Sequence, residues 1–407
     1  MDRSVLAMVV PAFFLLIAAE WVAARRLGRE LYRFDDGIAS LATGVLQTTA
    51  DFWLALWTLG SYAFVYEHAR QTELPMSSPW AWVLAMLGVD FLYYWFHRAS
   101  HRINLLWAAH VVHHQSEEYN LTTALRQSTL QPAYNAVFYW PLAVLGVPPD
   151  AAALLFTVDV LYQFWIHTRL IPPLGPLEYV LNTPSNHRVH HGIDPEYIDR
   201  NYGGILIIWD RLFGTYQAET TEPNFGTVKP LNSWNPLWAN VAYFGTIGDR
   251  VRAASRGRDR LFAWFAPPEW RSASEGGPIA IPAVERLRRQ LYRPKQHPLI
   301  NGYVAAQYAW VVLALLAMML SSTSLTQLQL VTLALWIALS AATWGGLLER
   351  KAWVRPLEYA RLVITVGLGF WILAPLAWSA AAGHAVAVGV AAVWLARLDL
   401  GPDEPQG

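Results

Sequence analysis

The sequence contains no cysteine in its 407 residues, which excludes disulfide bonds, thiolate metal ligands and iron–sulfur clusters. It also has little charge, because Asp, Glu, Lys and Arg make up only 15% of the residues and the formal net charge is zero. Proteins that bind nucleic acid usually carry a basic surface that neutralises phosphates. We therefore expect no nucleic-acid partner.

Two motifs that would indicate other enzyme classes are also missing. The chain has no HExxH sequence, which would indicate hydrolysis at a single zinc ion. Gly203 and Gly204 are followed by an apolar run and lack the GxGxxG spacing of a dinucleotide-binding loop. We therefore expect neither a zinc hydrolase of that type nor a dinucleotide site.

The chain is instead rich in long apolar runs, and 54% of its residues are hydrophobic. A run of about 20 apolar residues is long enough to span a bilayer. The predicted fold class is an all-α integral membrane protein, a multi-span helical bundle with a cytoplasmic helical cap. We expect about nine spans, at residues 4–23, 40–66, 79–96, 130–147, 150–168, 302–320, 327–347, 357–378 and 381–397.

Basic residues between the spans predict the orientation in the membrane. Arg25, Arg26, Arg29 and Arg33 lie between the first two runs, which places that loop in the cytoplasm by the positive-inside rule. Counting spans onward places residues 97–129 on the same side. We expect anionic lipid head groups as partners of these basic segments. The membrane is the inner membrane if the source is bacterial and the endoplasmic reticulum if it is eukaryotic.

The distribution of polar residues predicts three regions. Residues 1–168 form the N-terminal transmembrane helices, residues 169–301 a cytoplasmic cap, and residues 302–407 the C-terminal transmembrane helices. The middle region is the only long polar stretch, and paired prolines and glycines divide it into short helices and loops.

Histidine is the most informative residue type in this chain. Nine of the twelve histidines fall between His97 and His191, and eight of these nine form three clusters. The clusters are His97-x-x-x-His101, His110-x-x-His113-His114 and His187-x-x-His190-His191. Residues three and four apart share one face of a helix, so each cluster presents its imidazoles in a common direction.

Three such faces predict a metal site, and eight imidazoles exceed the three or four ligands of one tetrahedral zinc ion. Neutral imidazole suits iron, zinc, copper and nickel, so we expect a two-metal site without a fixed metal identity. His167 stands alone and is a further ligand or a neighbour of the site. His68, His297 and His384 are isolated, which is more typical of hydrogen-bonded core residues.

A metal pair at a membrane surface, with apolar helices below it, suits a reaction on a lipid. Oxidation of an unactivated C–H bond requires a redox metal, and two irons can share the electrons needed to cleave dioxygen. A non-enzymatic metal or haem transporter is an alternative. It predicts ligands spread along a transmembrane path, often with acidic partners.

Several stretches around the histidines resemble the fatty acid hydroxylase and sterol desaturase superfamily. These are Asp90 to Arg98, Asn201 to Gly204, and Trp209 to Tyr216, together with the three clusters. Within the superfamily, the closest resemblance is to the alkylglycerol monooxygenases, through Trp107 to His110, His113 to Ser128, Tyr162 to Thr168 and Leu174 to Glu178. Detailed similarity covers about residues 80–220.

The resemblance implies a di-iron oxygenase that uses dioxygen and tetrahydrobiopterin to insert one oxygen atom beside the ether bond of an alkylglycerol. The hemiacetal product would break down to a fatty aldehyde and a glycerol derivative. A ferredoxin or cytochrome is an alternative electron donor, and a sterol or fatty-acyl hydroxylase or desaturase of the same superfamily is an alternative function. By matching position, the resemblance assigns the metal-ligand role to His97, His101, His110, His113, His114, His187, His190 and His191, with His167 as a further candidate.

Three polar residues near the clusters are candidates for orienting the imidazoles from outside: Glu117, Asn120 and Asn201. Helix capping or surface solvation is the alternative role for each. Arg102 departs from the resemblance, because it follows the first cluster where an acidic residue is expected. An arginine beside two metal ions is unfavourable unless it points away or meets a carboxylate.

Overall fold

The computed structural model describes residues 3–280, 290–295, 297–375 and 377–401. Residues 281–289 and 296 of the predicted cap, and residue 376 of the eighth predicted span, lie outside these ranges. The described residues form helices and loops without a β-strand, apart from isolated bridges between Leu181 and Leu206 and between Gly192 and Phe225. The predicted all-α class is confirmed.

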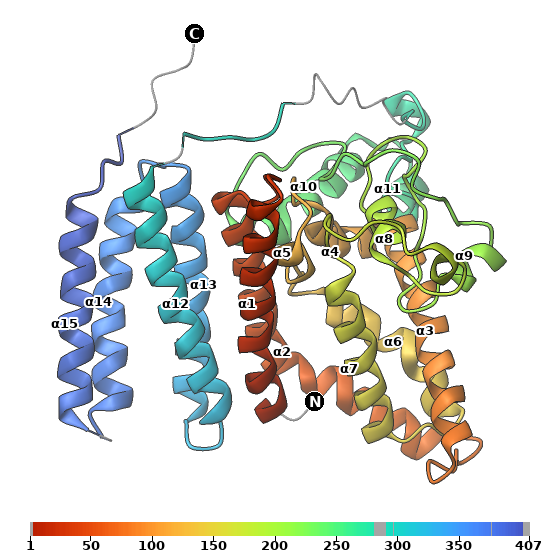
Figure 1. Cartoon of the computed structure of the whole chain (residues 1–407), viewed down its shortest axis with the longest axis horizontal. Coiled ribbons are helices and arrows are strands. Elements are labelled where there is room, and N and C mark those ends of the chain that lie inside the picture. The colour runs from red at the N-terminus through yellow and green to blue at the C-terminus, as the bar shows by residue number, and fades with distance from the viewer. Residues whose placement is uncertain (1–2, 281–289, 296, 376, 402–407) are drawn as a thin grey trace.

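The helices run in two sets that Figure 1 separates clearly. The N-terminal set contains α1 (Arg3–Arg26), α2 (Phe34–Ala69), α3 (Pro79–Arg102), α4 (Asn104–His114), α5 (Leu121–Ala124), α6 (Gln131–Val144) and α7 (Pro149–Trp165). The intervening polar region contains η1 (Gly175–Tyr179), α8 (Pro184–His190), α9 (Ile208–Leu212), α10 (Pro236–Ala253), α11 (Gly257–Phe265) and η2 (Ala273–Glu275). The C-terminal set contains α12 (Pro298–Leu320), α13 (Gln327–Leu348), α14 (Val354–Leu373) and α15 (Trp378–Ala396).

Local sequence explains where several of these helices begin. Thr183 precedes α8 and accepts a hydrogen bond from the N–H of Asn186, while Pro184 occupies the first helical position. Asn235 caps α10 in the same way, again followed by a proline. These caps satisfy N–H groups that would otherwise lack partners, so the polar region folds into short, defined helices.

Four helices among the described residues are long and apolar enough to cross a membrane, and they are α12 to α15. The helices α6 and α7 are shorter than the predicted spans, with 14 and 17 residues. At 1.5 Å per residue they extend about 21 and 26 Å, less than the roughly 30 Å of a bilayer core. The tight turn between them includes Gly146 at φ +85°, where a Cβ atom would lie 2.1 Å from the carbonyl oxygen of Thr72.

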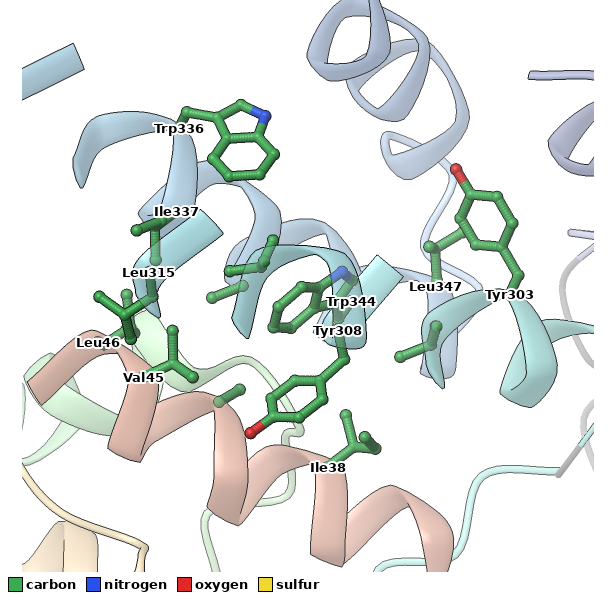
Figure 2. Close-up of a cluster of buried hydrophobic side chains, with 14 of the residues drawn as sticks. Ile38, Val45, Leu46, Tyr303, Tyr308, Leu315, Trp336, Ile337, Trp344 and Leu347 are labelled. Atoms are coloured by element: carbon green, nitrogen blue, oxygen red, sulfur yellow. The ribbon is translucent and has the colours of Figure 1, made fainter. Parts of the chain in front are cut away.

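A continuous hydrophobic core joins the two sets along α2. Figure 2 shows Ile38, Val45 and Leu46 of α2 facing aromatic and aliphatic side chains of α12 and α13. The same cluster includes Tyr308, Leu315, Trp336, Ile337 and Trp344. Burial of such side chains stabilises the contact by about 1.5 to 3 kcal/mol for each large residue. The helix α2 therefore packs against both sets and holds them together.

The short helices of the polar region gather at one end of the N-terminal set, over α3, α6 and α7 (Figure 1). Only Ile103 separates the end of α3 from the start of α4. Asn104, the first residue of α4, donates its backbone N–H to Ala266 and its side chain to Ala263 at the end of α11. This arrangement brings all three histidine clusters to the same end of the molecule.

Candidate metal centre

The structure brings the nine predicted histidines together, and it divides them into two groups. Within each group the nearest ligand nitrogens all lie within 4.8 Å of one another, and every one of these side chains is buried. The five-histidine group contains His97, His101, His110, His114 and His190. The four-histidine group contains His113, His167, His187 and His191.

Helix geometry explains the division. At about 100° per residue, positions i and i+4 differ by only about 40°, whereas position i+3 lies about 60° away from i in the other direction. Three pairs four residues apart therefore each share a group: His97 with His101, His110 with His114, and His187 with His191. The middle histidines, His113 and His190, point into the other group, so each HxxHH cluster contributes to both groups.

The outward nitrogen of most imidazoles is held by an oxygen acceptor. In the five-histidine group, Nδ1 of His97 lies 2.8 Å from the backbone oxygen of Tyr202, Nδ1 of His190 lies 3.0 Å from that of Arg200, and Nδ1 of His110 lies 2.9 Å from Oε1 of Gln131. In the four-histidine group, Nδ1 of His113 lies 2.9 Å from the backbone oxygen of Arg126, and Nδ1 of His167 lies 2.7 Å from that of Gln163. A carbonyl oxygen can only accept, so each of these Nδ1 atoms carries the proton. In a neutral imidazole, Nε2 is then left with a lone pair.

Seven Nε2 atoms lie close together, those of these five imidazoles and those of His114 and His187. In the five-histidine group, the Nε2–Nε2 distance is 3.0 Å between His97 and His110, and His114 lies 3.2 Å from both His110 and His190. In the four-histidine group, Nε2 of His167 lies 3.2 Å from that of His113 and 3.1 Å from that of His187. The Nε2 atoms of His101 and His191 are buried without a hydrogen-bond partner among the described residues. Converging lone pairs repel each other, and a cation at the centre of each group would remove that repulsion.

Burial keeps the imidazoles in the form that a metal requires. Removal from water, and then the neighbouring imidazoles, lower the pKa values of His110, His114, His187, His190 and His191. Burial also lowers the pKa of His113 to about 4. Protons therefore compete weakly with a metal ion at neutral pH, and an all-imidazole donor set fits a divalent transition metal such as iron.

Two of the three residues predicted to support the ligands make contacts elsewhere. Glu117 lies 3.4 Å from Arg33 and accepts the backbone N–H of Tyr292 at 2.9 Å. Asn120 caps α5 and donates its amide to the carbonyl oxygen of Leu31 at 2.7 Å. These bonds attach the segment after the second cluster to the start of α2, and a catalytic role for either residue stays a prediction.

Asn201 is connected to the imidazoles through the backbone. Its amide donates to the carbonyl oxygens of Asn186 and Gln217 at 2.9 and 2.8 Å, and its Oδ1 accepts the N–H of Gln217 at 2.8 Å. The neighbouring carbonyl groups, those of Arg200 and Tyr202, accept from His190 and His97. Asn201 therefore fixes the loop that holds two ligands, and its predicted role at the site is still a prediction.

Arg102 meets two carboxylates, and its side chain is 38% exposed. Its guanidinium forms ion pairs with Asp199 and, at 2.7 Å, with Glu269. The other carboxylate oxygen of Asp199 lies 3.6 Å from Nδ1 of His101. Burial alone would raise the pKa of Asp199, but the contacts with His101 and Arg102 hold it below its usual value. Sequence reasoning missed Asp199, because it is one of three acidic residues between the third cluster and Asn201 and nothing in the sequence distinguishes it from Asp194 and Glu196.

The three isolated histidines lie outside both groups. Nδ1 of His68 contacts the carbonyl oxygen of Phe64 at 2.9 Å, and Nε2 of His384 contacts that of Thr365 at 3.0 Å. His297 precedes the first residue of α12, and its Nδ1 has no hydrogen-bond partner among the described residues. The expectation of a hydrogen-bonded core residue is therefore wrong for His297, and also for His68, which is exposed.

Comparisons with known proteins cover both the site and most of the chain. The family model described as fatty acid hydroxylase matches residues 82–215, which include all nine grouped histidines. Three relatives named alkylglycerol monooxygenase match the chain. The one from Xenopus tropicalis is 37% identical over 86% of this chain and 79% of the relative. The one from Homo sapiens is 36% identical over 87% of this chain and 80% of the relative, and the one from Danio rerio is 38% identical over 82% of this chain and 74% of the relative. The chain belongs to the alkylglycerol monooxygenase family.

Membership of the alkylglycerol monooxygenase family confirms the resemblance inferred from the histidine clusters. The similarity to the alkylglycerol monooxygenases also extends well beyond the predicted region of about residues 80–220. No solved structure matches the chain.

Proposed function

We propose that this chain is a membrane di-iron monooxygenase that hydroxylates the carbon next to the ether bond of an alkylglycerol lipid. Dioxygen is the co-substrate, and the hydroxylated product breaks down to a fatty aldehyde and a glycerol derivative. The observation that carries the proposal is the pair of buried imidazole groups with converging Nε2 lone pairs, in a chain similar to alkylglycerol monooxygenases over most of its length.

Each histidine group would hold one iron ion, and the pair would supply the reductive activation of dioxygen that oxidation of an unactivated C–H bond requires. The residues around the imidazoles orient them for this task. Backbone oxygens of Tyr202, Arg200, Arg126 and Gln163 fix the ring orientation by accepting from Nδ1. The complete burial of both groups excludes bulk water from the reacting atoms.

The position of the groups fits a lipid substrate. His97 and His101 lie in the last turns of α3, and His167 follows the end of α7. Below them, α3 and α7 present apolar side chains outward, such as Leu84 (60% exposed) and Val160 (65% exposed). We infer that the alkyl chain lies among these apolar helices while its ether bond reaches the imidazole groups at the membrane surface.

We further propose that α1, α2, α3, α6 and α7 enter the bilayer in addition to the four C-terminal helices, with the polar region 169–301 as a cytoplasmic cap between the regions 1–168 and 302–407. The arginines at 25, 26, 29 and 33 support the cytoplasmic side. The short helices α6 and α7 would enter as one hairpin.

Tetrahydrobiopterin is the proposed reductant, and a separate ferredoxin or cytochrome is the alternative.

A second candidate function is hydroxylation or desaturation of a sterol or fatty-acyl chain, which the fatty acid hydroxylase model over residues 82–215 favours. A metal or haem transporter is disfavoured, because the nine histidines form two compact groups on the end of α3, on α4 and α8, and just after α7. They are not spread along a transmembrane path. An optical spectrum without a Soret band would exclude the haem version.

The test uses purified, iron-reconstituted protein supplied with dioxygen and a 1-O-alkylglycerol, with and without tetrahydrobiopterin. We expect two irons per chain and fatty aldehyde that appears only with the pterin. Two irons without aldehyde would reject the ether-lipid substrate or the pterin, and matched assays with a fatty-acyl lipid and with a ferredoxin system would then separate the alternatives. Absence of bound iron would reject the di-iron enzyme.

A further inference from the structure

One short loop supports three of the five histidines in the larger group. It provides the Asp199 carboxylate to His101 at 3.6 Å, the Arg200 carbonyl to His190 at 3.0 Å and the Tyr202 carbonyl to His97 at 2.8 Å. The smaller group is supported differently. The Nδ1 atoms of His113 and His167 face the backbone carbonyl oxygens of Arg126 and Gln163, which carry no charge.

We propose that Asp199 is a positioning residue that acts through His101 and makes the five-histidine metal site a stronger and electronically distinct site from the four-histidine one. This inference rests on the two-metal centre proposed above. A carboxylate facing the outer N–H of a metal-bound imidazole raises the basicity of that ligand, whereas a neutral carbonyl does so less. The two metals would therefore differ in affinity and in ligand field.

The separation of 3.6 Å between Asp199 Oδ1 and His101 Nδ1 is longer than a normal hydrogen bond. The interaction is therefore that of a full negative charge with a nearby ring N–H, which persists at this distance in a partly buried setting. Both groups are well shielded, with side-chain exposures of 7% for His101 and 27% for Asp199. The effect of Asp199 on the metal would therefore depend on the negative charge of its carboxylate and not only on the size of the side chain.

The surrounding residues hold this carboxylate in place. Arg102 binds its second oxygen and is itself anchored by Glu269, so Oδ1 stays turned toward His101. The backbone of the loop is also held in an unusual conformation, because Asp199 and Asn201 adopt φ values of +60° and +56°. Such left-handed conformations in residues other than glycine persist only where the surrounding structure enforces them, and the three hydrogen bonds of the Asn201 side chain do so here.

The decisive variant is Asp199→Asn, which removes the charge and retains the size. Asparagine tolerates the left-handed conformation well, so the loop should keep its shape. Asp194→Asn is the matched control, because Asp194 lies in the same segment but accepts from the backbone and side chain of Asn224, at 2.7 and 2.6 Å. Metal-free protein would be titrated anaerobically with Fe(II), and the ⁵⁷Fe-loaded protein examined by Mössbauer spectroscopy.

We expect Asp199→Asn to weaken one of two iron-binding steps by roughly 10- to 100-fold and to shift one of two quadrupole doublets, while the other step and doublet stay unchanged. Asp194→Asn should match the wild type in both measurements. Wild-type behaviour of Asp199→Asn, or equal weakening of both steps, would overturn the inference, because the residue would then have no effect or only a structural one.

A second variant guards against misfolding. Asp199→Gly accepts a φ of +60° without strain and should reproduce the selective loss; two wild-type binding steps in this variant would also overturn the inference. All these measurements are made without lipid substrate. A wild-type protein that binds two unequal irons but forms no aldehyde would reject the proposed substrate or reductant and leave the role of Asp199 intact.

Discussion

The histidine groups and the C-terminal helices both bury strongly polar side chains, but they satisfy them in opposite ways. In the C-terminal set, Arg361 and Glu358 of α14 are at most 1% exposed and lie 2.5 Å apart. In the candidate metal centre, the nine imidazoles turn ligand nitrogens toward one another within two groups. Burial of a polar group is thus a poor indicator of function by itself, and the informative property is whether its partners lie within the protein.

The C-terminal network is complete within the chain. Tyr303 donates to Glu358 at 2.6 Å, Arg361 donates to Gln307 at 2.6 Å, and Ser340 lies 3.4 Å from the guanidinium. These residues belong to α12, α13 and α14, so the ion pair connects three helices. Polar contacts of this kind between apolar helices fix how the helices align, and we assign this network a structural role.

The largest expected effect is the loss of a ligand. His113→Ala and His190→Ala each remove one imidazole from a different group, and we expect either change to abolish aldehyde formation, a loss greater than the 10- to 100-fold typical of supporting residues. The protein should remain inserted and largely folded, because the hydrophobic clusters that join its long helices contain none of the nine histidines. Product assays with iron analysis provide the measurement, and full activity in either variant would refute the assigned role.

Removal of the metal should affect one region and spare the other. Chelation restores the repulsion among the lone pairs, so we expect faster hydrogen exchange in α4 and α8 and no change in α13. A ligand at 1,000 times its dissociation constant stabilises the folded state by about 4 kcal/mol, which sets the scale of the expected drop in melting temperature. Equal protection of α8 with and without chelator would contradict the interpretation of the site.

Breaking the internal ion pair should have the opposite regional effect. Glu358→Ala leaves the Arg361 charge buried without its carboxylate, and we expect a cost of about 3 to 5 kcal/mol, measured as faster exchange in α12 and α14 with normal iron content in the folded fraction. The double variant Glu358→Leu with Arg361→Met is the control and should be much less destabilised. A double variant as unstable as the single one would show that the unpaired charge is not the cause.

The smallest effect is expected at the isolated histidines. His297→Ala and His384→Ala should leave turnover nearly unchanged, because both lie outside the two groups. Steady-state aldehyde formation by the two variants, compared with that of His190→Ala, measures this. A loss of activity comparable to that of His190→Ala would require a role in the reaction for either residue.

The sequence predicted which histidines gather but not how they divide. The HxxHH spacing places i and i+4 together on any helix, yet the target of His113 depends on where α7 and α8 lie relative to α4. The acceptors of the Nδ1 protons could not be predicted from the sequence either. Four of them are backbone carbonyl groups, which every residue type has. Asp199 reaches His101 only because a left-handed loop turns it back.

The fold shows a similar limit. Apolar runs predicted the helical class, but the runs at 130–147 and 150–168 are longer than α6 and α7, because the ends of the runs form the turn at Gly146 and the residues that lead to His167. The predicted division at residues 168 and 301 stays a prediction. Hydrophobicity reports what is apolar and does not mark where a helix stops.

The converging imidazoles also have a consequence for the life of the protein in a cell. If the two groups hold iron as proposed, a newly made chain without metal would keep its lone pairs opposed, and the end of the molecule built from α4, α7 and α8 would open more often. Proteases act on such opened states, and a modest change in opening free energy alters abundance several-fold. We therefore expect the amount of this enzyme in its membrane to follow the iron supply of the cell.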